Sequence, residues 1–287
     1  MVCTNENNSL KPAWGAILDV YKPFAEICAR HNLRMWVGYG TAIGTVRHKG
    51  FIPWDDDFDV VMPRPDYERF IDEFAKELPP HLKLVTQTNT PEFTLPFAKI
   101  MDSRRDVVEG VEKTLGRAMP QGVYIDIFPL DGFDTKASRL ASRFWTLVLK
   151  FRRAWLCRKL YPKHPRNKYL FALGFLSGVF TPLVHTKAQF DRYYHRLATQ
   201  VPFDGSEYCA YYEATYNAPR AFLTRCFADT VMMPFDDLEV PMPSGYHELL
   251  TREYGDYMTP PPSEKRVSNH QDSLVAQWKY GPTMEVL

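Results

Sequence analysis

The chain has 287 residues, of which 45% are hydrophobic and 24% are charged, and its formal net charge is +1. These are ordinary values for a globular protein that buries a full core, and they leave no overall positive field to attract nucleic acid. The five cysteines include no Cys-x-x-Cys pair. That excludes the usual zinc-knuckle pattern and favours buried or incidental thiols in a reducing compartment over a disulfide framework. The first residues lack a basic-then-apolar signal pattern, so we expect a cytoplasmic protein.

The first half of the chain alternates predicted helices with short predicted strands. The patterns predict a helix at 13–31 with a kink or break at Pro23, a strand at 34–37, a helix at 41–46, a strand at 57–62, a helix at 66–77, and strands at 82–86, 97–101 and 123–128. Pro129 is expected to end the last strand, and Asp131 to be a turn residue. This order indicates a mixed α/β (α+β) domain built around a sheet.

The sequence changes character after residue 134. Residues 135–200 are predicted to be helical, and residues 208–287 to mix short strands, loops and a helix at 246–254. Residues 135–190 contain twelve Lys or Arg and no Asp or Glu, so the rest of the chain carries a net charge of −11. Five aromatic residues are set into the basic run, and residues 169–184 have no charge at all.

The uncharged stretch is shorter than the ~20 residues of a transmembrane helix. Glycines and a proline interrupt it. A basic and aromatic helical region of this kind is suited to lying on an anionic membrane surface, and we assign that role to residues 139–184. The alternative is an apolar core helix beside a solvated basic face. Nucleic acid is not expected as a partner, because the run contains no recognisable binding module.

Four of the five residues from Asp55 to Asp59 are acidic, at the entry to a predicted buried strand. Side chains alternate along a strand, so Asp57 and Asp59 point to one face, and Asp55 joins them if the strand starts early. Clustered carboxylates favour a positive partner, and their hard oxygen ligands suit Mg²⁺ or Mn²⁺. The alternative is a solvated acidic loop, which fits a lone acidic pair better than this pattern.

Other candidate residues flank this cluster. Gly38, Gly40 and Gly44 surround a strand-to-helix turn of the kind that admits a phosphate at a helix N-terminus. Arg47 follows and could grip a phosphate with two hydrogen bonds. Asp126 stands in the apolar strand 123–128, where a charge is costly unless it has a partner; a shared metal would be one, and an edge strand facing water is the alternative.

Three sequence blocks resemble the LicD family. They are Gly40-Thr41 followed by residues 47–59 (RHKGFIPWDDDFD), residues 124–131 (YIDIFPLD), and residues 254–258 (YGDYM) followed by two prolines. The blocks span most of the chain. The first is long and specific, whereas the helical region between the second and third blocks matches nothing in the family pattern.

The resemblance implies a polymerase-beta-like nucleotidyltransferase fold, with residues 1–287 as one catalytic domain and 135–200 as a helical insertion. The family includes phosphocholine transferases and is related to fukutin-type proteins. Its pattern gives donor-phosphate contacts to Gly40 and Thr41, and metal ligands to Asp57, Asp59 and Asp126, with Asp55 as a further candidate. Fifteen residues separate Thr41 from Asp57, whereas Gly44-Thr45 would leave eleven, a better match to the superfamily. We prefer Gly40 because it directly follows a predicted strand.

These assignments predict a Mg²⁺- or Mn²⁺-dependent transferase. It would move phosphocholine from CDP-choline to a sugar hydroxyl of a cell-surface glycan or lipid-linked glycan, as in lipopolysaccharide or teichoic acid modification. Asp57, Asp59 and Asp126 would be catalytic, with Arg47 and Lys99 as phosphate contacts. Such an enzyme would be peripheral at the inner membrane face. A quaternary ammonium calls for an aromatic cage, and the candidates are Trp36, Tyr39, Trp54, Tyr211 and Tyr212.

Three alternatives stay open on the sequence. The donor could be CDP-ribitol, CDP-glycerol or another activated alcohol. The chain could be an inactive scaffold or glycan-binding subunit at a membrane, although retained acids in apolar strands argue against it. It could also be a metal-dependent phosphodiesterase that uses water as its acceptor.

Overall fold

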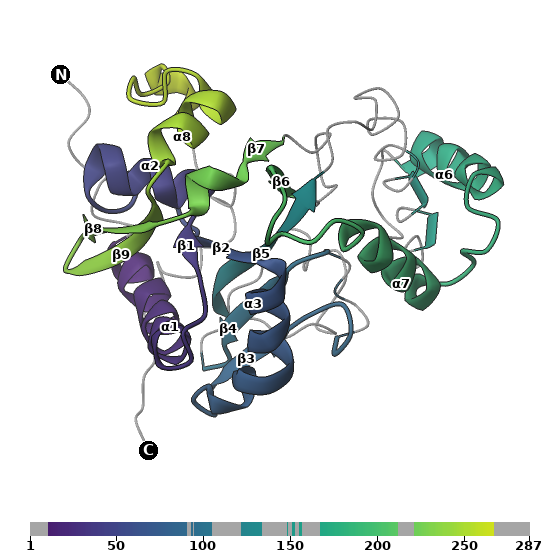
Figure 1. Ribbon diagram of the computed structural model, residues 1–287, viewed down its shortest axis with the longest axis horizontal. Helices are drawn as coiled ribbons and strands as arrows, with labels where there is room; N and C mark the ends of the chain where they lie inside the picture. The colour runs from purple at the N-terminus through teal and green to yellow at the C-terminus, as the bar shows by residue number, and fades with distance from the viewer. Residues whose placement is uncertain are drawn as a thin grey trace.

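A mixed β-sheet lies at the centre of the protein and carries the candidate site (Figure 1). The structure is a computed structural model, and it describes residues 11–90, 93, 95–104, 122–133, 148, 151–152, 155–156, 167–211 and 221–266. Within these residues the sheet has the strand order β1-β2-β5-β4-β3, and β6 and β7 extend it from β5. Strands β8 and β9 form a separate hairpin. The prediction of a mixed α/β fold around a sheet is confirmed.

The element bounds follow the predicted order closely. The strands are β1 (Trp36–Val37), β2 (Asp59–Pro63), β3 (Leu82–Val85), β4 (Ala98–Asp102), β5 (Val123–Phe133), β6 (Tyr208–Tyr211), β7 (Phe222–Leu223), β8 (Thr230–Phe235) and β9 (Leu238–Pro243). The helices are α1 (Lys11–Arg30), α2 (Tyr39–His48), α3 (Arg64–Arg69), α6 (Asn167–Leu176), α7 (Lys187–Ala198) and α8 (Tyr246–Tyr254). After α3 the chain continues as a π-helical turn (Phe70–Phe74) and a 3-10 turn (Ala75–Glu77).

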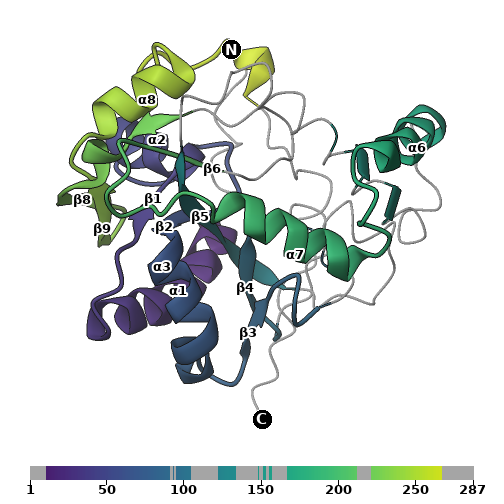
Figure 2. The same ribbon diagram turned by 45° about the vertical axis from the view of Figure 1, so that its right-hand side comes forward.

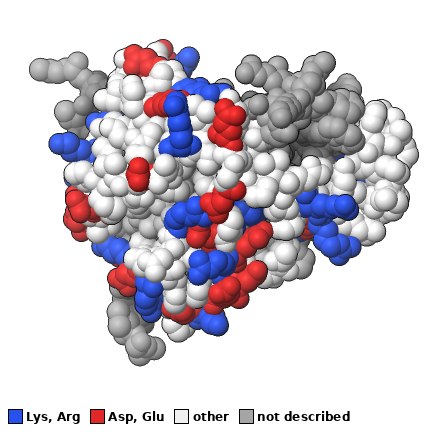
Figure 3. All heavy atoms as spheres, viewed as in Figure 1, with Lys and Arg blue, Asp and Glu red and all other residues white. Residues whose placement is uncertain are grey.

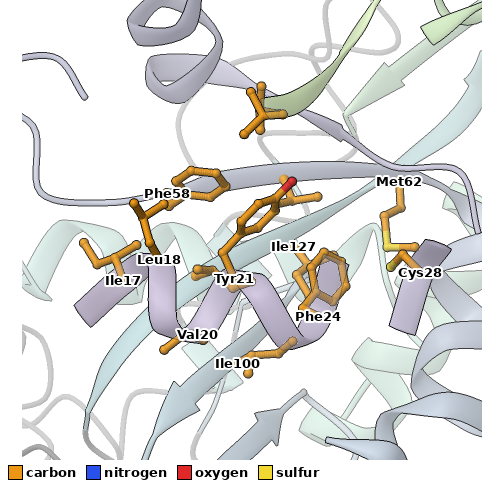
Figure 4. Close-up of a cluster of buried hydrophobic side chains, with 14 of the residues drawn as sticks. Ile17, Leu18, Val20, Tyr21, Phe24, Cys28, Phe58, Met62, Ile100 and Ile127 are labelled. Atoms are coloured by element: carbon orange, nitrogen blue, oxygen red, sulfur yellow. The ribbon is translucent and has the colours of Figure 1, made fainter. Parts of the chain in front are cut away.

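Helix α1 covers one face of the sheet (Figure 4). Its buried residues Ile17, Tyr21, Phe24 and Cys28 recur at intervals of three or four, which places them along one side of the helix. They meet side chains such as Ile127 that point from the strands toward α1. Each large apolar side chain buried in this way contributes ~1.5–3 kcal/mol, so this contact is a major source of stability.

Pro23 lies inside α1, and the helix continues on both sides of it. The break considered from the sequence therefore does not occur within Lys11–Arg30.

Strand β5 is the central strand and is longer than predicted. It pairs in parallel with β2, and antiparallel first with β4, up to Ile127, and then with β6, from Leu130 onward. Pro129 therefore falls in the gap between the β4 and β6 partners, where its missing N–H removes no ladder hydrogen bond on that side. The prediction that Pro129 ends the strand is wrong for this reason.

Asp131 is also not a turn residue. It lies within β5, is almost fully buried, and receives two hydrogen bonds from Arg64: Nε to Oδ1 at 2.7 Å and Nη2 to Oδ2 at 2.8 Å. A buried carboxylate needs such a partner, and a two-pronged arginine contact is the strongest kind. This pair ties the start of α3 to the second half of β5.

Between β5 and β6 the chain leaves the sheet and returns to it, because β6 pairs directly with β5. The described helices of this excursion, α6 and α7, agree with the predicted helical character of 135–200. Both ribbon views place α6 beyond α7, away from α2 and α8 (Figures 1 and 2). That residues 1–287 fold as one unit stays a prediction.

The described cysteines Cys28, Cys209 and Cys226 are buried free thiols, as the sequence indicates. Burial raises the pKa of Cys209 to about 12 and that of Cys226 to about 11, so both thiols stay protonated at neutral pH. Cys3 and Cys157 lie outside the described residues.

Candidate active site

A row of three charged side chains crosses the middle of the sheet. Asp59 of β2 is in register with Asp126 of β5, and Asp126 is in register with Lys99 of β4. Residues paired across adjacent strands point to the same face. This face is the one opposite α1, because the alternating neighbours Val60 and Ile127 belong to the core under α1. All three charged residues are buried.

Lys99 is the charged partner of Asp126. Its Nζ lies 3.0 Å from Oδ1 and 3.2 Å from Oδ2 of that carboxylate, and 3.4 Å from the centre of the Tyr124 ring. The sequence predicted a partner for a buried Asp126 and considered a metal in that position or an edge strand facing water. The edge-strand alternative is wrong, because β5 has neighbours on both sides. In the structure the lysine ammonium neutralises the carboxylate. The assignment of Lys99 as a phosphate contact stays a prediction.

The acidic loop begins before the strand does. Strand β2 starts at Asp59, two residues later than predicted, so Asp55 and Asp57 lie in the preceding loop. Phe58, which lies between Asp57 and Asp59, is fully buried in the core on the α1 side. The Trp14 indole donates to the Asp55 carbonyl at 2.8 Å and holds the loop against α1.

Asp55 and Asp57 lie close enough to share a hydrogen bond between their carboxyl groups. Burial, together with the negative charges of Asp57 and Asp56, raises the pKa of Asp55 well above its usual range. The folded state therefore holds this proton more tightly than the unfolded state does. The stability contributed by Asp55 accordingly falls as the pH rises through its raised pKa.

The first turn of α2 lies beside these acids. A Cβ on Gly40 would come within 2.6 Å of Asp55 Oδ2, so only glycine fits between the helix backbone and this carboxylate. Tyr39, the first residue of the helix, has a φ of 45°, which is unusual for a non-glycine residue. Strained backbone conformations of non-glycine residues, such as that of Tyr39, are concentrated at functional sites. The first-turn amides of the helix therefore stand close to Asp55, where a helix N-terminus favours anions.

Thr41 links this turn to the acidic row. Its buried hydroxyl accepts a 2.8 Å hydrogen bond from the Asp59 backbone N–H, so the hydroxyl positions the first residue of β2. Gly44, the alternative glycine in the sequence, lies elsewhere: a Cβ there would come within 2.5 Å of the Gly50 carbonyl oxygen. Of the two glycines, Gly40 is therefore the one that lies beside the acids.

Two arginines lie near the end of α2. Arg47 donates from Nη1 to the Tyr257 carbonyl at 2.8 Å. This hydrogen bond connects the C-terminal motif 254–258 to the end of α2. Partial burial and the nearby positive charge of Arg266 lower the pKa of Arg47, and Asp55 partly offsets them. Arg266 stacks over the Trp54 ring at 5.4 Å and donates to the Pro261 carbonyl. The sequence analysis missed Arg266, because no local pattern marks it and only folding brings it to the acidic loop.

Aromatic rings line the same face of the sheet. Tyr39 contacts Phe128 at 4.9 Å and Tyr211 at 4.8 Å between ring centres, and Phe97 contacts Phe128 at 4.4 Å. Tyr39 and Tyr211 are half-buried. Trp36, another cage candidate, is fully buried and donates to Thr230.

The two remaining cage candidates are Trp54 and Tyr212. Trp54 lies beside Arg266 rather than with the tyrosines. Tyr212 lies outside the described residues.

These residues can be tested for their fit to a divalent cation. The donors are of the right type: Asp55, Asp57, Asp59 and Asp126 supply hard carboxylate oxygens, and the crowding of Asp55 by its acidic neighbours shows excess negative charge. In the part of the chain that the structure describes, no three His, Cys, Asp or Glu side chains form a ready metal-binding group. Asp126 is held by Lys99. The residue types therefore fit a metal, and binding one requires these side chains to move together.

A mixed sheet with carboxylates on its central strands and a glycine-containing helix start beside them defines a nucleotidyltransferase-like α+β protein. Residues 32–156 match the family described as LicD/FKTN/FKRP, nucleotidyltransferase domain. The chain is 31% identical over 262 residues to a Haemophilus influenzae protein named lipopolysaccharide cholinephosphotransferase LicD, covering 88% of this chain and 92% of that relative. The chain belongs to the LicD family.

Shorter matches concern two uncharacterised Rickettsia proteins. The identity is 34% over 55 residues for the one from R. typhi, 19% of this chain and 18% of that protein. It is 35% over 51 residues for the one from R. prowazekii, 18% of this chain and 19% of that protein.

The crowding of the acidic loop generates a stability prediction. Asp57→Asn removes one negative charge beside Asp55 and provides an amide that can donate to it. We expect its melting temperature in EDTA to rise by roughly 2–4 °C, the shift for about 1 kcal/mol in a protein of this size. Asp229→Asn, at an exposed position, is the matched control and should leave the melting temperature unchanged. A fall in the melting temperature of Asp57→Asn would contradict the like-charge account.

Proposed function

We propose that this chain transfers phosphocholine from CDP-choline to a sugar hydroxyl of a cell-surface glycan precursor and releases CMP. The observation that carries the proposal is the in-register pair Asp59–Asp126, with Asp57 just before it and the α2 N-terminus beside it. The name of the Haemophilus relative, a lipopolysaccharide cholinephosphotransferase, supports the transferred group and the acceptor class.

In the proposed reaction the acceptor hydroxyl oxygen attacks the phosphorus that bears choline. The bond from that phosphorus to the bridging oxygen breaks, and CMP leaves with the electron pair. The acceptor proton passes to a carboxylate, for which Asp126 is the candidate because it lies in the acidic row.

The donor diphosphate carries negative charge that has to be balanced beside the acids. The first-turn amides of α2 at Gly40 and Thr41, together with Arg47 and Arg266, are the groups that would bind it. A Mg²⁺ or Mn²⁺ ion, bound by Asp57 and Asp59 with Asp126 or Asp55 as a further ligand, would supply charge neutralisation at the phosphates. In this proposal Lys99 binds the Asp126 carboxylate and does not contact the phosphate directly.

The aromatic rings beside the acidic row support choline over other alcohols. Tyr39 and Tyr211 present half-buried ring faces on the sheet face that carries Asp126. A quaternary ammonium binds aromatic faces, whereas ribitol and glycerol have no positive charge for them to bind. CDP-ribitol and CDP-glycerol are therefore the second choice of donor.

We place the enzyme at the inner face of a membrane, where lipid-linked glycan precursors are assembled. The buried free thiols of Cys28, Cys209 and Cys226 are compatible with a reducing compartment. The basic region 139–184 is the candidate membrane contact.

The reaction is tested by CMP release from CDP-choline with Mg²⁺ and a glycan acceptor. We expect release that stops in EDTA and falls by at least about 100-fold in Asp57→Asn and Asp59→Asn, since each removes charge where the phosphates are neutralised. Asp229→Asn, which changes an exposed aspartate outside the proposed site, should release CMP at the normal rate. Full-rate release without acceptor would identify a phosphodiesterase instead. A folded protein that releases no CMP from CDP-choline, CDP-ribitol or CDP-glycerol would favour the inactive scaffold.

Arg266 provides a separate test of where the donor binds. Arg266→Gln keeps a hydrogen-bonding side chain but removes the positive charge, and we expect the KM for CDP-choline to rise about 10- to 100-fold, as for a lost charged hydrogen bond. Arg225→Gln is the control, because Arg225 is an exposed arginine paired with Glu248. Steady-state CMP release gives both values, and an unchanged KM in Arg266→Gln would place the diphosphate elsewhere.

A further inference from the structure

The segment formed by α6 and the turn after it has its large apolar side chains on the outside. Val179 and Leu183 are 75% and 83% exposed, and Phe175 is 64% exposed. We call the whole set the α6 apolar surface; it consists of Leu173, Phe175, Leu176, Val179, Phe180 and Leu183. Single exposed apolar residues are ordinary, but six within eleven consecutive positions form a patch that calls for a partner.

The inner side of the same segment is made of small and polar residues. Gly174, Ser177, Gly178 and Thr181 are buried or half-buried, at intervals of three and four. A Cβ on Gly174 would come within 2.6 Å of Trp155 Cβ, so glycine is needed for this close approach. The arrangement is the reverse of a normal amphipathic helix in water, which turns its large apolar side chains inward. Small residues at helix contacts and large ones outside are typical of segments that meet lipid.

Buried hydrogen bonds fix this orientation. The guanidinium of Arg152 donates from Nε and Nη2 to the Val184 carbonyl. Ser177 donates to the Gly174 carbonyl at 2.5 Å, and Thr181 donates to the Ser177 carbonyl at 3.0 Å. The Ser177 and Thr181 bonds lie within the segment and satisfy its buried hydroxyls. Turning the segment over would break the Arg152 bonds to Val184 and bury the large side chains against an arginine. The outward direction of the apolar side chains is therefore a property of the packing.

Charge identifies the kind of partner. The surface lies within residues 135–190, which hold twelve Lys or Arg and no acidic residue. Figure 3 shows a lobe that is almost entirely white, with blue side chains at its lower edge over α7. A second copy of the chain seated on this surface would bring two such basic segments face to face, and they would repel each other. An anionic lipid surface attracts the basic residues and accepts the apolar ones.

We propose that the α6 apolar surface is a shallow membrane-docking site. Its large side chains would insert among the acyl chains of anionic lipids, and Lys and Arg of the basic segment 135–190 would bind the headgroups. In the described part of the chain no helix has the length and hydropathy of a membrane span, so the contact is one of docking. Helix α7 leads from this surface to β6, which pairs with the strand that carries Asp126. Docking would thus fix the active-site sheet relative to the membrane.

The test is co-sedimentation of the full chain with vesicles, one set of phosphatidylcholine alone and one containing phosphatidylglycerol. We expect binding to the anionic vesicles that weakens near 1 M salt, where the Debye length is about 3 Å. Val179→Ser/Leu183→Ser should bind them about tenfold more weakly or worse, since two inserted side chains are lost. Val231→Ser/Met232→Ser, which changes two exposed apolar residues of the β8 strand, is the matched control and should bind like the unchanged protein.

Four outcomes would overturn the proposal. They are no binding of the unchanged protein to anionic vesicles, equal binding by Val179→Ser/Leu183→Ser, a dimer in solution that this variant converts to a monomer, and a lowered melting temperature of this variant. The third would show a second copy on the surface, and the fourth would show that the chain's own residues cover it. Binding is measured without donor or acceptor, so its failure and the failure of the proposed transferase reaction are separate results.

Discussion

The pairing of β2 with β5 is the constraint on which the site depends. It sets Asp59 beside Asp126 in the middle of the sheet, where two buried carboxylates would repel each other and lose their hydration. Lys99 from β4 compensates one of these charges. The sheet can contain such a row because α1 buries an extensive apolar surface on the opposite face. The stability of the core thus supports a locally unfavourable concentration of charge, as expected where chemistry needs it.

The groups around this row come from distant parts of the sequence. The start of α2 lies against Asp55, with Gly40 at the point of closest approach. The Tyr257 carbonyl of the motif 254–258 accepts a hydrogen bond from Arg47. Arg266, in the chain that follows this motif, lies near Arg47. The three sequence blocks that resemble the LicD family therefore all contribute residues to the candidate site. The α6 apolar surface, which lies between the second and third blocks in the sequence, is the proposed membrane contact.

Much of the fold follows from local sequence pattern, whereas the partners of charged residues do not. The apolar runs located β1 to β4 to within about two residues, whereas β5 continues five residues past its predicted end. The helix at 246–254 was predicted with its observed bounds. The sequence showed that a buried Asp126 needs a partner, but the register of β4 on β5 decides that this partner is Lys99. Asp131 was misread for the same reason, because its partner Arg64 lies on another element. The outward direction of the α6 side chains likewise depends on packing.

This acidic row and its flanking arginines are proposed to bind a metal–diphosphate donor. The most direct measurement is the anomalous diffraction of Mn²⁺ in crystals grown with CDP-choline. We expect an anomalous peak in contact with the Asp57 and Asp59 carboxylates, with the donor diphosphate between that ion and Arg266. A peak away from these aspartates, or a diphosphate bound on another face of the sheet, would contradict it.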